Sequence, residues 1–343
     1  MATSRPLRLG FFTRLLDEGS AAERYRCATE QIQRAEAFGF DTAWVAQHHF
    51  HEAEGGLPAP LVFLAHVAAR TSRIRLGTGV VTLPMEQPIR VAEDAAVLDI
   101  LSGGRLELGV GSGGNPTAFA AFGLGNDDRR SVFEAHLATL RDALGGQALP
   151  GGDRIYPARP GLLDRIWFAT FSVEGARAAG RLGTGLLLSR TQPRTADEPD
   201  ATLADIQDPM VDAYLGALPV GVAPRILASR SVFVADSRAE ALRHAEVGLR
   251  RFQARLAATG RGGPPDLPLA DIIRRQDVHL GTPEEVLASL RADRVLDRAT
   301  DLAVQVHSVD PPHALVLRSI ELVATAVAPA LGWRPAAPAL RVA

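Results

Sequence analysis

The chain has 343 residues, of which 46% are hydrophobic and 22% charged, and its formal net charge is −2. A nearly neutral chain gives no electrostatic reason to expect nucleic acid or an anionic membrane surface as a partner, so a small organic molecule is expected. All 37 lysine-plus-arginine residues are arginine, which excludes chemistry that needs a lysine amine for a Schiff base or a carbamate bridge.

Cys27 is the single cysteine, so no disulfide forms within the chain and a thiol nucleophile is not expected. No apolar run approaches the roughly 20 residues that a membrane span needs, and the first residues lack the apolar core of a secretion signal. The sequence therefore predicts a cytoplasmic protein with no membrane partner.

Taken in chain order, short apolar runs alternate with amphipathic segments. Strands are predicted at 7–15, 42–46, 74–83, 105–111, 166–170, 185–188, 231–235 and 301–306. Helices are predicted at 22–38, 61–70, 91–101, 131–144, 173–182, 210–218, 238–258, 283–292 and 313–328. Eight strands with a helix after each predict a single (β/α)8 TIM barrel with loop insertions over residues 1–343. An open, doubly wound sheet is the alternative.

Two long polar segments interrupt this alternation, at 190–209 and 259–270. Long loops inside a compact domain are uncommon and often close over active sites, so both are candidate lids.

The stretch 74–114 carries the clearest sign of a binding site. The run IRLGTGVVTLP leads through a helical pattern into RLELGVGSGG, so two parallel strands both end in glycine-rich turns. Parallel strands place these turns at one edge of a sheet, where small residues let a flat ligand lie against bare backbone. Arg90, Glu93, Asp94 and Asp99, on the helix between them, are interpreted as structural.

In a barrel, the residues that follow each strand build the site. His48 and His49 follow the second strand and are the candidate catalytic residues. His49 and His51 have the H-x-H spacing of some metallohydrolases, but no histidine follows the fifth or sixth strand. A metal site is therefore not expected.

The segment 109–114 fits the dinucleotide pattern G-x-G-x-x-G, which is a weak match. The acidic residue that a dinucleotide-binding fold needs about 20 positions later, at the end of the next strand, is missing. The glycines are better explained by close approach of the backbone to a phosphate or a ring, to which Ser112 adds a hydroxyl.

The segments VAQHHF, GTGVVTLP, QPIRVAEDAAVLDILSGGRLELGVGSGG and WFATFSVEGARAAGRLGTGLLLS together resemble the bacterial luciferase-like flavin-dependent monooxygenases. The resemblance runs from about residue 7 to 331. It implies a (β/α)8 barrel that binds reduced FMN at the carboxyl edge of its strands and oxygenates a small organic substrate through a flavin C4a-hydroperoxide. It also implies a separate flavin reductase as a transient partner, and a homodimer or higher homo-oligomer.

The resemblance also assigns residues. Gly79 and Val80 match a non-proline cis peptide that lies against the flavin, and His48, with His49 beside it, matches the active-site histidine. Ser172 matches a phosphate-side serine. The remaining candidate cofactor-binding residues are Gly111, Ser112, Gly113, Phe171 and Ser189.

Some positions depart from the family pattern. Gln47 replaces a common glutamate, Phe171 replaces a polar residue, and Ser112 replaces an arginine that contacts phosphate in the luciferases. Two alternatives to an FMN monooxygenase therefore stay open. They are an oxidoreductase that uses the deazaflavin F420 and a non-catalytic flavin-binding protein.

Overall fold

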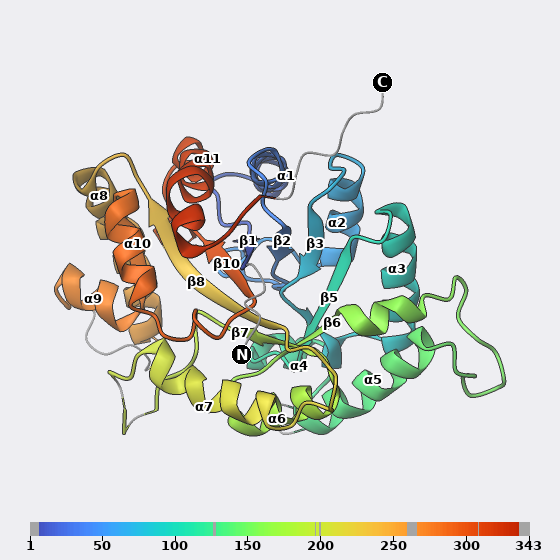
Figure 1. Ribbon diagram of the computed structural model, residues 1–343. Helices are drawn as coiled ribbons and strands as arrows, with labels where there is room; N and C mark the ends of the chain where they lie inside the picture. The colour runs from blue at the N-terminus through green and yellow to red at the C-terminus, as the bar shows by residue number, and fades with distance from the viewer. Residues whose placement is uncertain are drawn as a thin grey trace.

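Eight parallel strands close into a barrel in the computed structural model, which describes residues 7–125, 128–195, 197–198, 200–258, 266–307 and 309–335. Strand β10 pairs with both β8 and β1, so the eight barrel strands close into a ring and the predicted (β/α)8 barrel is confirmed. Figure 1 shows the helices around the outside of these strands. The barrel strands are β1 (Arg8–Thr13), β2 (Thr42–Val45), β3 (Arg75–Thr78), β5 (Leu106–Gly111), β6 (Ile166–Ala169), β7 (Gly185–Leu188), β8 (Ile226–Val234) and β10 (Asp301–Gln305).

The outer layer consists of helices that begin at recognisable caps. Ser20 and Glu23 form a capping box at the start of α1, and Thr202 and Asp205 form another at α7. The longer helices are α1 (Ala21–Ala37), α2 (Pro60–Ala68), α3 (Pro88–Leu101), α5 (Arg129–Leu144), α6 (Val173–Arg181), α7 (Leu203–Leu215), α8 (Arg238–Ala258), α10 (Pro283–Arg291) and α11 (His313–Leu322). The short elements are β4 (Val81–Thr82), η1 (Leu83–Met85), α4 (Pro116–Ala121), η2 (Pro160–Arg165), α9 (Leu269–Arg275), β9 (Val278–Gly281), η3 (Val323–Val327) and η4 (Ala328–Leu331).

Two tryptophans fill the inside of the barrel. Trp44 and Trp167 meet edge to face with ring centroids 5.6 Å apart. A Cβ on Gly77 would lie 2.2 Å from Trp44, and one on Gly185 would lie 2.3 Å from Trp167, so both strands need glycine there. Leu187, Leu227 and Ala303 complete this inner cluster. The barrel is therefore packed solid below its mouth.

Several predicted boundaries differ from the structure, and three of them bear on the barrel and its loops. The third predicted strand, 74–83, is interrupted between β3 and β4. The seventh begins at Ile226 rather than 231, because the buried Arg230 pairs with Asp293 and so fits inside a strand. The predicted loop 190–209 ends at Thr202, because the capping box starts α7 there and the helix continues through Pro209.

The short elements α4, α9, β9, η1 and η2 were not predicted. β9 pairs with the outer half of the long β8, beyond the part of β8 that closes the barrel. Its four residues include the polar His279, so the sequence carries no apolar run to reveal it. Of the predicted loop 259–270, residues 259–265 lie outside the described part of the chain.

Among the described residues, one stretch is long and apolar enough by composition to be tested as a membrane span, His313–Leu331. Of its test window, 44% is buried inside the protein. Val316 and Ile320 are buried in the core, and α11 lies beside α1. Its apolar composition is thus that of a helix packed on a barrel.

Candidate active site at the mouth of the barrel

The two glycine-rich turns lie side by side, as the sequence predicted. The peptide bond between Gly79 and Val80 is cis, and β4 follows it directly. β4 pairs with the last residues of β5, so Thr82 lies opposite Gly111. Because the third predicted strand is broken between β3 and β4, the turn that follows β3 lies against the carboxyl end of β5.

A threonine side chain bridges β3 and β5 where regular pairing stops. The Thr78 hydroxyl donates to the Gly109 carbonyl at 2.7 Å and accepts from the Gly109 N–H at 2.9 Å. A Cβ on Gly109 would lie 1.9 Å from the Thr78 carbonyl oxygen. Glycine is therefore required at this position by close contact of two backbones.

The mouth has an apolar floor made by Phe12, Val80 and Ala169. These side chains are partly buried and pack on the inner tryptophan cluster. A Cβ on Gly79 would lie 2.5 Å from Phe12 Cε2, and one on Gly111 would lie 3.0 Å from Val80 Cγ2. Because these two glycines have no side chain, no side chain projects from them between the apolar groups of the floor.

Gln47, at the end of β2, holds this floor in position. Its Oε1 accepts from the Thr82 N–H at 2.7 Å, and its Nε2 donates to Glu86 at 2.7 Å and to the Pro58 carbonyl at 3.1 Å. An amide can accept and donate at once, whereas an ionised glutamate only accepts. Gln47, where many members of the family carry glutamate, therefore still anchors β4 through its hydrogen bond to Thr82.

His48 lies on the rim beside this anchor. Its side chain is 27% exposed, and its Nδ1 lies 4.0 Å from Glu54 Oε2. Burial, with smaller contributions from the charges of Arg14, His49 and Arg190, lowers its pKa to about 3. The imidazole is therefore neutral near pH 7, able to accept at one ring nitrogen and donate at the other.

His49 points toward a different environment. Its ring packs edge to face on Phe122 with centroids 4.9 Å apart, and also contacts Phe50. Its Nε2 is buried without a hydrogen-bond partner in the described part of the chain, and burial lowers its pKa. The sequence left open which histidine serves the site; the structure places His48 near Glu54 and His49 against Phe122.

The low pKa of His48 predicts a pH-dependent stability. The unfolded chain protonates this histidine below its ordinary pKa of 6.5, whereas the folded protein resists protonation until about pH 3. The free energy of unfolding should therefore fall as the pH drops from about 6.5 toward 4, because the unfolded state binds more protons. Urea denaturation over this range should give a shallower slope for His48→Gln than for the wild type. Equal slopes would contradict this.

Three arginines hold the loop 50–56 that covers His48. A Cβ on Gly55 would lie 2.6 Å from His48 Cδ2, so the loop touches the imidazole. Three consecutive carbonyls of this loop each accept from an arginine on a different segment. The pairs are Arg24 with Glu52, at 2.7 Å, Arg255 with Ala53, and Arg14 with Glu54.

Arg14, together with Arg190 after β7, gives one side of the mouth a positive electrostatic field. Burial, together with the charge of neighbouring arginines, lowers the pKa of Arg14 to about 10 and that of Arg190 to about 9. Arg190 donates to Gln305 at 2.8 Å and to Ser231 at 3.0 Å. No sequence pattern marks Arg14, because it is one arginine among 37.

The remaining candidate residues lie at the ends of β5, β6 and β7, which pair in that order. Ser172 is the N-cap of α6, and its own N–H donates to Thr170 Oγ1 at 3.2 Å. Phe171 is 53% exposed. Ser189 bonds Thr191 at 3.0 Å, and Gly113 has a positive φ of 69° beside the partly buried Ser112. The structure thus brings these residues to the same rim as Gly79, Val80 and Gly111.

A profile of the luciferase-like monooxygenases matches residues 8–300. The chain belongs to the luciferase-like monooxygenase family. It is therefore an oxidoreductase, and the resemblance read from its motifs is confirmed. The 4-hydroxyprotoasukamycin monooxygenase of Streptomyces nodosus subsp. asukaensis is 32% identical over 76% of this chain and 75% of that protein.

Two solved monooxygenase structures share this fold. A monooxygenase from Streptomyces bottropensis has a TM-score of 0.76 at 26% identity and covers 94% of this chain and 99% of its own. The oxygenating constituent of 3,6-diketocamphane monooxygenase from Pseudomonas putida, in complex with FMN, has a TM-score of 0.73 at 19% identity, covering 95% and 98%.

A second group within this fold uses a deazaflavin. The coenzyme F420-dependent tetrahydromethanopterin reductase of Methanopyrus kandleri has a TM-score of 0.68 at 17% identity, covering 95% of this chain and 99% of its own. At this identity the likeness is one of fold. FMN and F420 therefore both occur among the neighbours that share this fold.

Two hollows flank the loop 50–56, with volumes of about 180 and 140 Å³. Both are smaller than the roughly 300–1,000 Å³ of typical ligand sites. Within the described ranges, neither is lined by Gly79 or Gly111. The first is lined by Ala21, Arg24, His48, Phe50, His51, Glu52, Gly55, Gly56 and Pro58, and the second by Leu16, Arg24, Glu52, Ala53, Arg251, Arg255 and Asp310.

Proposed function

We propose that this protein is a monooxygenase that binds reduced FMN at the mouth of its barrel and uses O2 to oxygenate a small organic substrate. The observation that carries the proposal is the low apolar floor of Phe12, Val80 and Ala169, flanked by Gly79 and Gly111. A planar ring system matches such a floor, and family membership supports a flavin.

Different residues around the floor would bind different parts of the cofactor. The ring would lie over Val80, while the phosphate would take backbone N–H groups and hydroxyls near Ser112, Gly113 and Ser172. Phe171 and Ser189 would border the phosphate side. When bound, the reduced flavin would supply the activation of oxygen.

The chain's own groups would control protons and charge. Neutral His48 would donate or accept a hydrogen bond at the reacting edge of the ring without adding charge. Arg14 and Arg190 would stabilise negative charge in the site, where burial strengthens electrostatic interactions. The loop 50–56, held by three arginines, would exclude water.

Anaerobic titration with reduced FMN and, in parallel, with reduced F420 tests the proposal. We expect reduced FMN to bind more tightly, and admission of O2 to produce an absorbance transient that free reduced FMN does not show. Preference for F420 without oxygen consumption would instead support the deazaflavin alternative. Binding of FMN with no oxygen-dependent transient would support a flavin carrier.

The floor itself predicts a binding defect. Gly111→Leu would place a side chain over Val80, where a Cβ alone already comes within 3.0 Å. We expect reduced FMN to bind at least ~10-fold more weakly, about 1.4 kcal/mol. Gly161→Ala is the matched control, because a Cβ there meets nothing within 4 Å. If a folded Gly111→Leu protein bound reduced FMN as tightly as the wild type, the flavin ring would not bind over this floor.

The partners follow from the same proposal. A separate reductase would supply reduced flavin in the cytoplasm, and the chain would work as a homodimer or higher homo-oligomer. Exposed apolar side chains on α2 and α3 support an oligomer face. They are Val62, Val97, Ile100 and Leu101. Sedimentation velocity would test the oligomer.

A further inference from the structure

Three arginines line the smaller of the two hollows beside the barrel mouth. They are Arg24 on α1 and Arg251 and Arg255 on α8, and the other lining residues are Leu16, Glu52, Ala53 and Asp310. Its volume of about 140 Å³ accommodates a group of a few heavy atoms but not a flavin. Arg251 lies 3.9 Å from Asp310, so one of the two acidic side chains is partly paired. The arginines outnumber the acids, which leaves one net positive charge around the hollow.

Two of these arginines have unused hydrogen-bond donors. Arg24 donates to the Glu52 carbonyl at 2.7 Å and Arg255 donates to the Ala53 carbonyl, and neither pairs with a carboxylate in the described part of the chain. The buried Arg105, which also has no carboxylate partner there, instead donates five hydrogen bonds through its guanidinium. Arg24 Nε is buried without a hydrogen-bond partner among the described residues. A buried donor of this kind needs an acceptor, which a bound anion would supply.

Arg14 adds to the positive field around this hollow. It donates to the Glu54 carbonyl, the next carbonyl of the same loop, and it forms no ion pair within the described ranges. Burial and the charge of Arg255 lower its pKa to about 10, although Glu54 and Asp310 partly offset them. Like charges held close together in a buried place disfavour one another, so an anion near both guanidinium groups would be stabilised.

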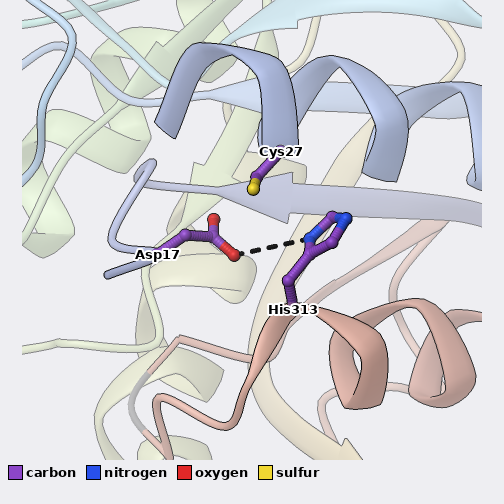
Figure 2. A group of neighbouring side chains, drawn as sticks. All are labelled: Asp17, Cys27 and His313. Carbon is purple, nitrogen blue, oxygen red and sulfur yellow. Dashed lines mark ion pairs between the residues drawn. The ribbon is translucent and has the colours of Figure 1, made fainter. Parts of the chain in front are cut away.

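Asp17, a buried carboxylate that follows β1, does not neutralise these arginines. Figure 2 shows its side chain in a separate group with Cys27 and His313. It accepts from the Gln31 amide at 2.9 Å, and it lies 3.5 Å from His307 and 3.6 Å from His313. These contacts use its negative charge within that group, so the arginines keep theirs.

Arg24 connects the hollow with the proposed reaction site. It also lines the neighbouring hollow of about 180 Å³, whose wall includes His48. In the loop between the two hollows, Gly55 contacts the His48 imidazole, and the carbonyl of Ala53, two residues earlier, accepts from Arg255. A molecule with a charged end beside Arg24 and Arg255 would therefore extend toward His48.

We propose that the substrate of this protein carries a carboxylate, which binds in the hollow between Arg24, Arg251 and Arg255. The inference rests on the proposed function, because it assigns one end of the molecule to be oxygenated. A carboxylate matches the planar fork of a guanidinium and accepts two parallel hydrogen bonds from it. Its single negative charge balances the net charge of the hollow, whereas a phosphate monoester brings nearly two.

Calorimetric titration of the flavin-free full chain with matched pairs of small molecules tests the carboxylate site. The probes are hexanoate and benzoate, each compared with its primary amide, which has nearly the same shape without the charge. We expect the carboxylate of at least one pair to bind at least ~10-fold more tightly than its amide. Added salt should reduce this preference, because ions screen charges near the surface. If neither carboxylate binds more tightly than its amide, the inference is wrong.

Variants of the arginines locate the carboxylate. Arg24→Gln and Arg255→Gln should each reduce the preference for the carboxylate at least ~5-fold and leave the affinity for the amide nearly unchanged. Arg243→Gln is the matched control, because Arg243 lies on the same helix as Arg255 with its side chain 67% exposed, and it should keep the preference. Circular dichroism of each variant checks folding. An unchanged preference in folded Arg24→Gln and Arg255→Gln proteins would refute the site.

Reduced FMN separates this inference from the proposed function. Arg255→Gln should bind reduced FMN as tightly as the wild type, because the flavin phosphate would lie near Ser112 and Ser172. If this variant lost affinity for reduced FMN and kept the carboxylate preference, the arginines would serve the flavin phosphate and the inference would be overturned. If the wild type bound no reduced FMN but preferred carboxylates, the proposed function would fail while the carboxylate site would be supported.

Discussion

Replacing His48 by asparagine is expected to reduce the turnover of reduced flavin, O2 and substrate by about 10²–10⁴-fold, the usual contribution of a positioned acid–base group. The imidazole follows β2 on the rim of the mouth, and its pKa of about 3 keeps it neutral. Asparagine keeps a polar side chain but has no basic ring nitrogen that could accept a proton during the reaction. The affinity for reduced FMN should change only a few-fold, because His48 would contact only one edge of the ring.

Two other histidines make this result specific. His49→Asn should have a smaller effect, because His49 packs on Phe122 rather than among the charged groups of the mouth. His66→Asn, on the outer face of α2, should retain wild-type turnover. Single-turnover kinetics with flavin reduced beforehand separate the chemical step from binding. Wild-type turnover in His48→Asn would refute a catalytic role and favour a flavin carrier.

Replacing Asp99 by alanine is expected to destabilise the protein by about 3–5 kcal/mol, because it leaves two arginines without their shared carboxylate. Asp99 is fully buried at the end of α3. Arg165 donates to it at 2.6 and 3.0 Å, and Arg159 donates through Nε at 2.9 Å. Although burial alone would raise the pKa of Asp99, hydrogen bonds from these arginines lower it, so the carboxylate is ionised.

The exposed Asp94 on the same helix is the matched control. It pairs with Arg90 at 2.9 Å, but both side chains are more than half exposed. Asp94→Ala should therefore lower the free energy of unfolding by less than about 1 kcal/mol. Equilibrium denaturation in urea measures both variants. A loss below about 1 kcal/mol for Asp99→Ala would mean that the two arginines find water or other partners.

The order of strands and helices was predictable because each element carries a local pattern. Apolar runs bounded by glycine, and amphipathic segments that follow caps such as Ser20, depend on neighbours within a few residues. The errors fall where a distant partner overrides that pattern. Arg230 sits inside β8 only because Asp293, 63 positions away, neutralises it. β9 exists only because β8 extends beyond the barrel.

The candidate site divides in the same way. The glycines of the two turns were recognisable, because only glycine tolerates the contacts that Gly109 and Gly111 make. The roles of Gln47 and Arg14 were not, because each depends on which backbone group the fold brings within reach. The preference for His48 over His49 likewise depends on Phe122 and Glu54, which no local pattern connects to either histidine.

The sequence by itself therefore determined the alternating βα order, the glycine-rich edge and the family. Each of these depends on the spacing of residues that are close together in the sequence and on the steric limits of single residues. The tertiary structure alone decided the closure of β10 onto β1 and the three arginines on one loop. It also decided the meeting of Asp17 with His307 and His313. Those contacts join residues far apart along the chain, and folding brings them together because closing the barrel buries a continuous core that no single segment specifies.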